Sequence, residues 1–211
     1  MIQNIFLIII AYLLGSISSA VWIGKRFYGV DVREHGSKNA GATNVMRVLG
    51  RKAAAPVFII DFMKGFVAVK LALLAVGLDN DPSQEFYMEM ALAVAAVLGH
   101  IFPIFAKFKG GKGVATIAGA ALSMTTIPIL LSLATFIIVL LITKYVSLGS
   151  MAGGIGYPLF LLFVEKESIE QIIFGVVIAI ALIITHRKNI KRLIKGEESK
   201  TYLIRKWKKK E

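Results

Sequence analysis

The side chains best suited to bind phosphate lie between the first two long apolar runs, in residues 35–47 (HGSKNAGATNVMR). Gly36 and Gly41 allow the backbone to approach a ligand closely and to turn N–H groups toward it. The arginine that ends the stretch has a planar fork that matches two phosphate oxygens. An ordinary polar loop leading into a helix would explain the same stretch taken alone. The residues expected to contact a ligand here are Ser37, Thr43, Asn44 and Arg47.

A second anion-binding pattern occurs in residues 107–114 (KFKGGKGV), where three glycines surround Lys112 and an apolar run follows at once. Unpaired amides at the start of a helix, together with the helix dipole, favour a phosphate at this position. The spacing and the missing β-strand exclude a P-loop of the Walker type. A simple turn between two helices is the alternative. The glycines expected to line the ligand are Gly110, Gly111 and Gly113.

Two further candidate positions lie in the second half of the chain. His186 and Asn189 end the last apolar run, and their spacing of three predicts that they share one face of a helix. A histidine at a helix C-terminus also interacts favourably with the helix dipole, which is the competing explanation. Ser150 stands in a small-residue helix entry and is expected to donate to a ligand.

Several other residues limit the possible chemistry. Asp61 and Lys64 are charged residues three positions apart inside an apolar run, which predicts an ion pair facing other helices. His100 is expected to cap a helix or to satisfy buried carbonyl groups. The chain has no cysteine, so disulfides and thiolate nucleophiles are excluded. Its three histidines lack paired spacing with acidic residues, so we expect no metal site, and no cofactor is implied.

The elements that carry these residues are expected to be transmembrane helices. The chain has 211 residues, 56% of them hydrophobic, and a mean hydropathy of +0.72, which is typical of an integral membrane protein. The fold class predicted is all-α, a polytopic helix bundle that forms a single domain over 1–211. The segment 114–126 is short for a crossing, so a re-entrant or buried helix stays open there. About seven spans are predicted, over 3–24, 53–77, 87–106, 114–126, 127–143, 148–164 and 169–186.

Charge between the spans predicts their orientation. The net charge is +12, yet the charges stand between apolar runs, which favours anionic lipids and substrates over nucleic acid as partners. Residues 25–52 hold seven bases against two acids, and the chain from Arg187 holds eleven against three. The connections 79–89 and 165–170 hold seven acids and one base. The positive-inside rule therefore places the N-terminus outside, the C-terminus inside and a basic tail, about 197–211, in the cytoplasm.

Taken together, these motifs resemble the bacterial family of acyl-phosphate:glycerol-3-phosphate acyltransferases. The similarity extends over essentially the whole chain, with small departures at Ser18 and at 38–40. No single motif is sufficient, but six in the same order at compatible spacing are specific. They are residues 15–20, 33–47, 61–65, 99–103, 108–113 and 186–189.

The resemblance implies transfer of an acyl group from acyl phosphate to the sn-1 hydroxyl of glycerol 3-phosphate, at the cytoplasmic face of a bacterial inner membrane. It implies that Ser37, Arg47, Lys112, His186 and Asn189 act in catalysis, and that a substrate phosphate oxygen accepts the proton. His186 as a general base is the alternative. A transporter of phosphorylated metabolites and a lipid-binding scaffold remain competing functions. The sequence leaves the oligomeric state open and is compatible with a monomer.

Overall fold

The structure, a computed structural model, describes residues 2–78 and 81–201. Every regular element within these ranges is a helix, in agreement with the predicted fold class. The chain divides into two compact units, Met1–Thr126 and Ile127–Glu211, which are described separately. Of the predicted basic tail, 202–211 lies outside the described residues.

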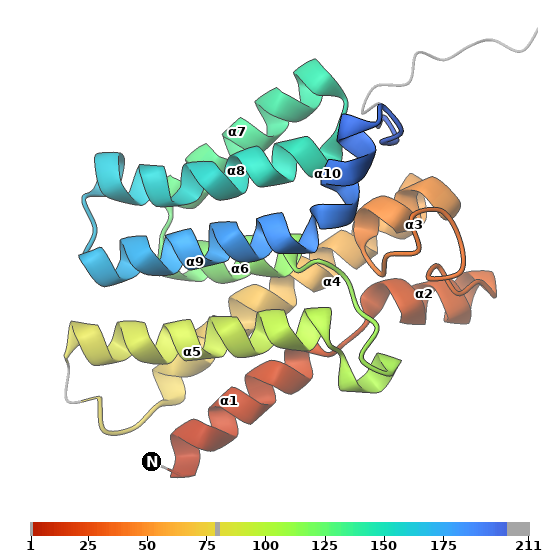
Figure 1. Ribbon diagram of the computed structural model, residues 1–211. Coiled ribbons are helices and arrows are strands. Elements are labelled where there is room, and N and C mark those ends of the chain that lie inside the picture. Colours follow the sequence, from red (N-terminus) through yellow and green to blue (C-terminus); the bar gives the residue numbers. More distant parts are fainter. Residues whose placement is uncertain (1, 79–80, 202–211) are drawn as a thin grey trace, which may run out of the picture. The chain divides into compact units, whose positions relative to one another are not determined.

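The described part of the first unit, 2–78 and 81–126, contains six α-helices and two short 3-10 turns, and Figure 1 shows their arrangement. α4 packs along α6, and α1 packs along α5. A short polar segment that contains α3 connects α2 to α4. The elements are α1 (Ile2–Gly15), α2 (Ser19–Tyr28), α3 (Ala42–Val48), α4 (Arg51–Lys70), η1 (Leu71–Leu74), α5 (Pro82–Ile101), η2 (Ile104–Ala106) and α6 (Val114–Met124).

Glycines bring the paired helices of this unit into backbone contact. A Cβ atom at Gly65 or Gly119 would lie 2.0 or 1.9 Å from a backbone oxygen of the facing helix, in the α4–α6 pair. The corresponding distances at Gly15 and Gly99, in the α1–α5 pair, are 2.1 and 2.2 Å. Small residues that allow such approach are typical of helix packing in membranes, where close van der Waals contact drives association.

The single helix predicted over 3–24 is wrong, because α1 and α2 are separate helices bent by 42°. Serines near the break favour non-helical backbone, and the carbonyl groups released there need partners. The ammonium group of Lys64 donates to Ile17 O at 2.8 Å, and Ser19 Oγ donates to Asp61 Oδ1 at 2.8 Å. The predicted ion pair is confirmed, with Lys64 Nζ 2.9 Å from Asp61 Oδ1. This pair therefore also supports the broken helix.

The second unit consists of α7 (Ile127–Thr143), α8 (Val146–Phe160), α9 (Ile169–Thr185) and α10 (Arg187–Ile194), with a π-helical turn at Leu161–Glu165. α8 packs against both α7 and α9 (Figure 1). α9 begins with a capping box in which Ser168 Oγ accepts from Gln171 N and the Gln171 side chain accepts from Ser168 N. α10 follows α9 after a bend of 60°.

Two of the described helical stretches can cross a membrane by length and apolar composition, Pro82–Ala106 and Val146–Glu165. Counting each bent pair, α1 with α2 and α9 with α10, as one span raises the number to four. Helices are present at each of the seven predicted ranges, but α4 carries several charged residues and α6 and α7 are short for this criterion. The number of crossings and their orientation stay predictions.

Candidate active site

The polar segment 31–44 is organised by the side chain of Asn44. Its Oδ1 accepts from Ser37 N at 2.8 Å, while its Nδ2 donates to Val32 O at 2.7 Å and to His35 O at 3.1 Å. The side chain is buried, with 1% of the residue exposed. Asn44 was expected to donate to a substrate, but both amide hydrogens are donated to carbonyl groups of its own loop. Its main effect is to hold Ser37.

Gly36 is required by the same arrangement. Its φ of +58° is rarely adopted by other residues, and a Cβ there would lie 2.5 Å from Asn44 Oδ1. Ser37, which follows, is partly exposed. Thr43 and Arg47 lie on α3, four residues apart, so they share one side of that helix. The segment thus presents a serine, a threonine and an arginine from a backbone that Asn44 fixes.

In the segment 107–113, the expected role of two backbone amides needs correction. Gly110 N donates to Ile101 O at 3.2 Å and Gly111 N donates to His100 O at 3.1 Å, so these amides are not free donors for a phosphate. The glycines instead permit close packing, because a Cβ at Gly110 would lie 2.0 Å from His100 O. Gly113, with φ of +83°, follows Lys112 and is the N-cap residue of α6. The positive end of the α6 dipole and the lysines of the segment, Lys112 among them, therefore supply the positive charge here.

The structure brings these two segments together within the first unit. Arg33 Nη1 donates to Ala106 O at 2.9 Å, across 73 positions of sequence. A Cβ at Gly111 would lie 2.9 Å from Ala40 O, which places the two backbones in contact. Two stretches that were each ambiguous in the sequence are thus neighbours, as a common phosphate-binding region requires.

A buried polar cluster lies beneath the second segment. His100 Nδ1 lies 3.2 Å from Thr116 Oγ1 and 3.6 Å from Asp61 Oδ1. The opposite ring nitrogen, Nε2, faces Gly111, where a Cβ would lie 2.2 Å away from it. The contacts of Nδ1 are thus with a hydroxyl group and a carboxylate. Together these contacts fix the end of α5, to which the glycine segment is hydrogen-bonded.

In the second unit, His186 stands at the bend between α9 and α10. Its Nδ1 lies 2.8 Å from Leu182 O, and because a carbonyl oxygen only accepts, Nδ1 carries the hydrogen. A neutral ring then has its lone pair on Nε2, the arrangement a general base needs. Asn189 N donates to His186 O at 2.8 Å, so the two candidates occupy one turn of backbone. Both residues are buried.

Asn189 is held by a residue that the sequence did not indicate, Glu198. Its Oε1 accepts from Asn189 Nδ2 at 2.6 Å and from Ser147 Oγ at 3.0 Å, and its Oε2 accepts from Arg192 Nε at 2.7 Å. Burial alone would raise the pKa of Glu198, but these donors outweigh it and hold the pKa below its usual value. The start of the basic tail therefore packs into the unit. The sequence indicated Glu198 only as an acidic residue in a segment rich in basic ones.

Ser150 lies on α8 and its hydroxyl donates to Val146 O at 2.9 Å, one turn earlier. This bond is common for serine inside a helix and uses its only donor. A role for Ser150 in substrate binding would therefore require the hydroxyl to rotate or to accept. The candidate residues form two groups, one in each unit.

Comparison with known proteins identifies the family. The family model described as glycerol-3-phosphate acyltransferase matches residues 5–196. The chain belongs to the glycerol-3-phosphate acyltransferase family. A member from Bacillus anthracis is 44% identical over 198 residues, covering 94% of this chain and 99% of that protein. One from Salinibacter ruber is 40% identical over 206 residues, covering 92% and 90%.

Solved structures of the family agree with this assignment. Crystal structures of PlsY, an integral membrane glycerol 3-phosphate acyltransferase, are known in a glycerol 3-phosphate form and a lysophosphatidic acid form. The first matches with a TM-score of 0.85 and 40% identity, covering 95% of this chain and 96% of that one. The second matches with a TM-score of 0.80 and 39% identity. The predicted family, enzyme class and membrane location are confirmed.

Proposed function

We propose that this chain transfers an acyl group from acyl phosphate to the sn-1 hydroxyl of glycerol 3-phosphate. The observation that carries the proposal is the match, over 95% of the chain, to PlsY in its glycerol 3-phosphate form. The products are 1-acyl-glycerol 3-phosphate and inorganic phosphate, and the reaction is the first step of phospholipid synthesis. The hydroxyl oxygen attacks the acyl carbonyl, and the carbon–oxygen bond to the phosphate breaks.

Acyl phosphate as donor is supported by the charges available in the first unit. Both proposed substrates carry phosphate, and Arg47 and Lys112 are cations on the two segments that the structure makes neighbours. Lys112, with the positive end of α6, stabilises charge on the departing phosphate. Gly110, Gly111 and Gly113 shape the backbone around that group. The apolar helices accommodate the acyl chain.

In this proposal, Ser37, Arg47, His186 and Asn189 hold glycerol 3-phosphate. Thr43 and Ser150 add hydroxyl groups to the binding site, and Asn44 contributes by holding Ser37 in place. In this proposal, 1–211 is a single acyltransferase domain. Much of the rate would come from alignment of the two substrates. The chain lacks cysteine, so a thiol acyl-enzyme does not form.

The proton of the attacking hydroxyl passes to a phosphate oxygen of the substrate. A phosphate monoester with a second pKa of about 6 is a competent acceptor near neutral pH. His186 positions glycerol 3-phosphate in this scheme. Its tautomer, with hydrogen on Nδ1, also suits a general base, so the pH dependence of a His186 variant separates the two roles.

The proposed topology has seven spans, with the N-terminus outside and the active site facing the cytoplasm at the inner membrane. It is supported by the basic segments 25–52 and 107–112 and by the acidic connections 79–89 and 165–170. Because the chain has no cysteine, single cysteines can report the topology. Lys109→Cys is expected to react with an impermeant maleimide only from the cytoplasmic side, and Ser83→Cys only from the outer side. Reversed labelling would refute the orientation.

The function is tested with purified protein in lipid vesicles, supplied with glycerol 3-phosphate and either palmitoyl phosphate or palmitoyl coenzyme A. We expect lysophosphatidate to form rapidly with palmitoyl phosphate. Lys112→Arg should impair turnover severely, because a planar guanidinium group replaces a compact ammonium group. The transporter alternative predicts uptake of glycerol 3-phosphate into sealed vesicles without product. A lipid-binding scaffold predicts neither product nor an effect of Lys112→Arg. Product from the coenzyme A thioester alone would overturn the choice of donor.

A further inference from the structure

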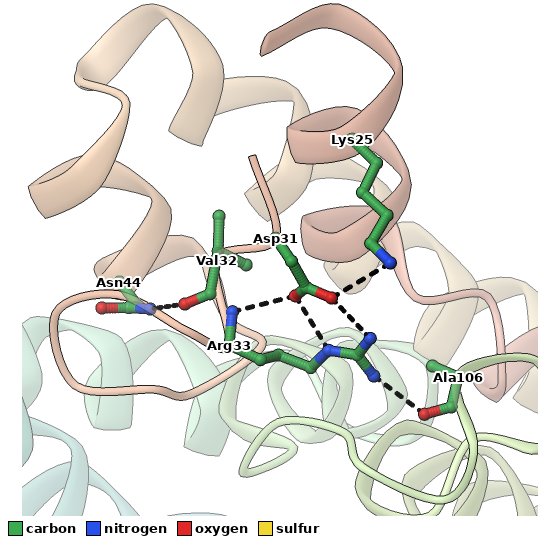
Figure 2. A network of polar contacts seen from close by, with 6 residues as sticks. All are labelled: Lys25, Asp31, Val32, Arg33, Asn44 and Ala106. Atoms are coloured by element: carbon green, nitrogen blue, oxygen red, sulfur yellow. Dashed lines mark hydrogen bonds and ion pairs between the residues drawn. The ribbon is translucent and has the colours of Figure 1, made fainter. Parts of the chain in front are cut away.

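A salt-bridged turn precedes the first substrate-binding segment. Asp31 accepts from Arg33 Nε at 2.9 Å and from Arg33 Nη2 at 2.7 Å, which is a two-point contact between fork and carboxylate (Figure 2). Arg33 N also donates to Asp31 Oδ1 at 3.0 Å, and Lys25 Nζ lies 3.1 Å from Asp31 Oδ2. The Asp31 carboxylate therefore fixes the orientation of the Arg33 guanidinium.

The remaining nitrogen of this guanidinium reaches a distant part of the chain. Arg33 Nη1 donates to Ala106 O at 2.9 Å (Figure 2). Ala106 is buried and ends η2, and the same carbonyl accepts from Lys109 N at 3.3 Å. The two residues that follow, Lys107 and Phe108, adopt positive φ angles of 57° and 58°. Hydrogen bonds thus hold Ala106 in place, and the segment with Lys112 begins directly after it.

On its other side, Arg33 is joined to the segment with Ser37. Asn44 accepts from Ser37 N and donates to Val32 O, the residue next to Arg33. Figure 2 shows Asn44, Val32, Arg33, Asp31 and Ala106 linked in one series of contacts. A continuous path of hydrogen bonds, with the peptide link between Val32 and Arg33, therefore joins the segment with Ser37 to the turn at Ala106 that precedes the segment with Lys112.

We propose that Arg33 is a positioning residue that sets the spacing between two segments. These are residues 35–47, which bind glycerol 3-phosphate, and residues 107–113, which bind acyl phosphate. The inference rests on the proposed function. Only a planar side chain with several donors can engage one carboxylate through two nitrogens and a carbonyl through a third. A lysine at this position keeps the charge but has a single nitrogen, so it cannot reproduce the fork on Asp31 together with the bond to Ala106.

Loss of this link affects the alignment of two substrates more than the binding of either. Each segment keeps its own binding groups, so the KM of each substrate changes little. The reacting atoms lose their relative placement, and a misplacement of about 1 Å can cost roughly a hundredfold in rate. A defect of Arg33 should therefore appear in kcat.

The test compares Arg33→Lys with Arg26→Lys, a matched control at an exposed position in the last turn of α2. In lipid vesicles with both substrates varied, Arg33→Lys should lower kcat about 10- to 100-fold while each KM stays within about threefold. The control should match wild type. Thermal unfolding should show that Arg33→Lys is folded.

Asp31→Asn removes the carboxylate that orients the guanidinium, so it should also lower kcat. The double variant should have a kcat no lower than that of Arg33→Lys.

Wild-type kcat in both Arg33→Lys and Asp31→Asn, or a raised KM with unchanged kcat, would overturn the positioning role. If Arg33→Lys fails to fold, Asp31→Asn decides by the same split between kcat and KM. An inactive wild-type protein would instead refute the proposed function, so the two failures are distinguishable.

Discussion

Gly119 marks the closest approach of α4 and α6, and its replacement by alanine tests how that packing supports catalysis. A Cβ at this position would lie 1.9 Å from Phe62 O and 2.8 Å from Phe62 C. Both atoms belong to the backbone, so neither can rotate away. Ordinary contact begins at 3.4 Å, so the helices must separate locally by about 1.5 Å.

The size of the effect follows from two opposing terms. Overpacking a close contact costs about 1–3 kcal/mol, and a backbone clash belongs at the upper end of that range. Alanine recovers about 1 kcal/mol relative to glycine within a helix. We expect the free energy of unfolding to fall by about 2 kcal/mol. Because α6 begins at Val114, two residues after Lys112, its displacement should also lower kcat about 100-fold.

The assay measures denaturant unfolding in detergent and kcat in lipid for Gly119→Ala. Gly156→Ala on α8 is the matched control, since its Cβ would meet the ring of Phe160 at 3.0 Å, and that side chain can move. The control should keep wild-type activity with equal or higher stability. Gly119→Ala with wild-type stability and wild-type kcat would refute the packing argument.

Three further variants test the polar groups. Asn44→Asp keeps the acceptor for Ser37 N but loses two donated bonds worth about 1 kcal/mol each, so steady-state kinetics should show a roughly 10- to 30-fold higher KM for glycerol 3-phosphate. Arg33 holds the pKa of Asp31 below its usual 3.8, so this carboxylate stabilises the fold above that pH and loses its effect below it. The difference in unfolding midpoint between wild type and Asp31→Asn should be constant from pH 8 to 5 and shrink as the pH falls below about 4. In His186→Asn, the pH–kcat profile should keep its inflection near pH 6, because the substrate phosphate titrates there.

Specific results would contradict each of these expectations. An unchanged KM in Asn44→Asp would mean that the bonds made by Asn44 do not position Ser37. A difference for Asp31→Asn that grows as the pH falls would reverse the sign of the linkage. Loss of the inflection in His186→Asn, with KM retained, would assign the proton to the histidine.

The helices were largely predictable because their signal is local. The apolar runs at 127–143 and 169–186 correspond to α7 (Ile127–Thr143) and α9 (Ile169–Thr185). The ion pair of Asp61 and Lys64 was readable because charges three residues apart in an apolar run must share a helix face. The break after Gly15 was missed, since Lys64, which donates a hydrogen bond to the released carbonyl group of Ile17, is distant in sequence.

The fine structure of the site was less predictable. The glycine pattern indicated free amides at Gly110 and Gly111, but those amides donate to the end of α5, and no local pattern reveals that bond. Glu198 contacts Ser147 across 51 positions, and Arg33 contacts Ala106 across 73. Residue type and spacing indicate which groups can bind phosphate. The contacts that position those groups depend on the tertiary fold.

The most direct test of the proposed chemistry follows one oxygen atom. Palmitoyl phosphate labelled with ¹⁸O at the bridging oxygen is incubated with glycerol 3-phosphate and purified protein, and both products are examined by mass spectrometry. Acyl transfer predicts one lysophosphatidate per phosphate released, with all of the label in the phosphate and none in the new ester. Label recovered in palmitate, or phosphate released without lysophosphatidate, would contradict it.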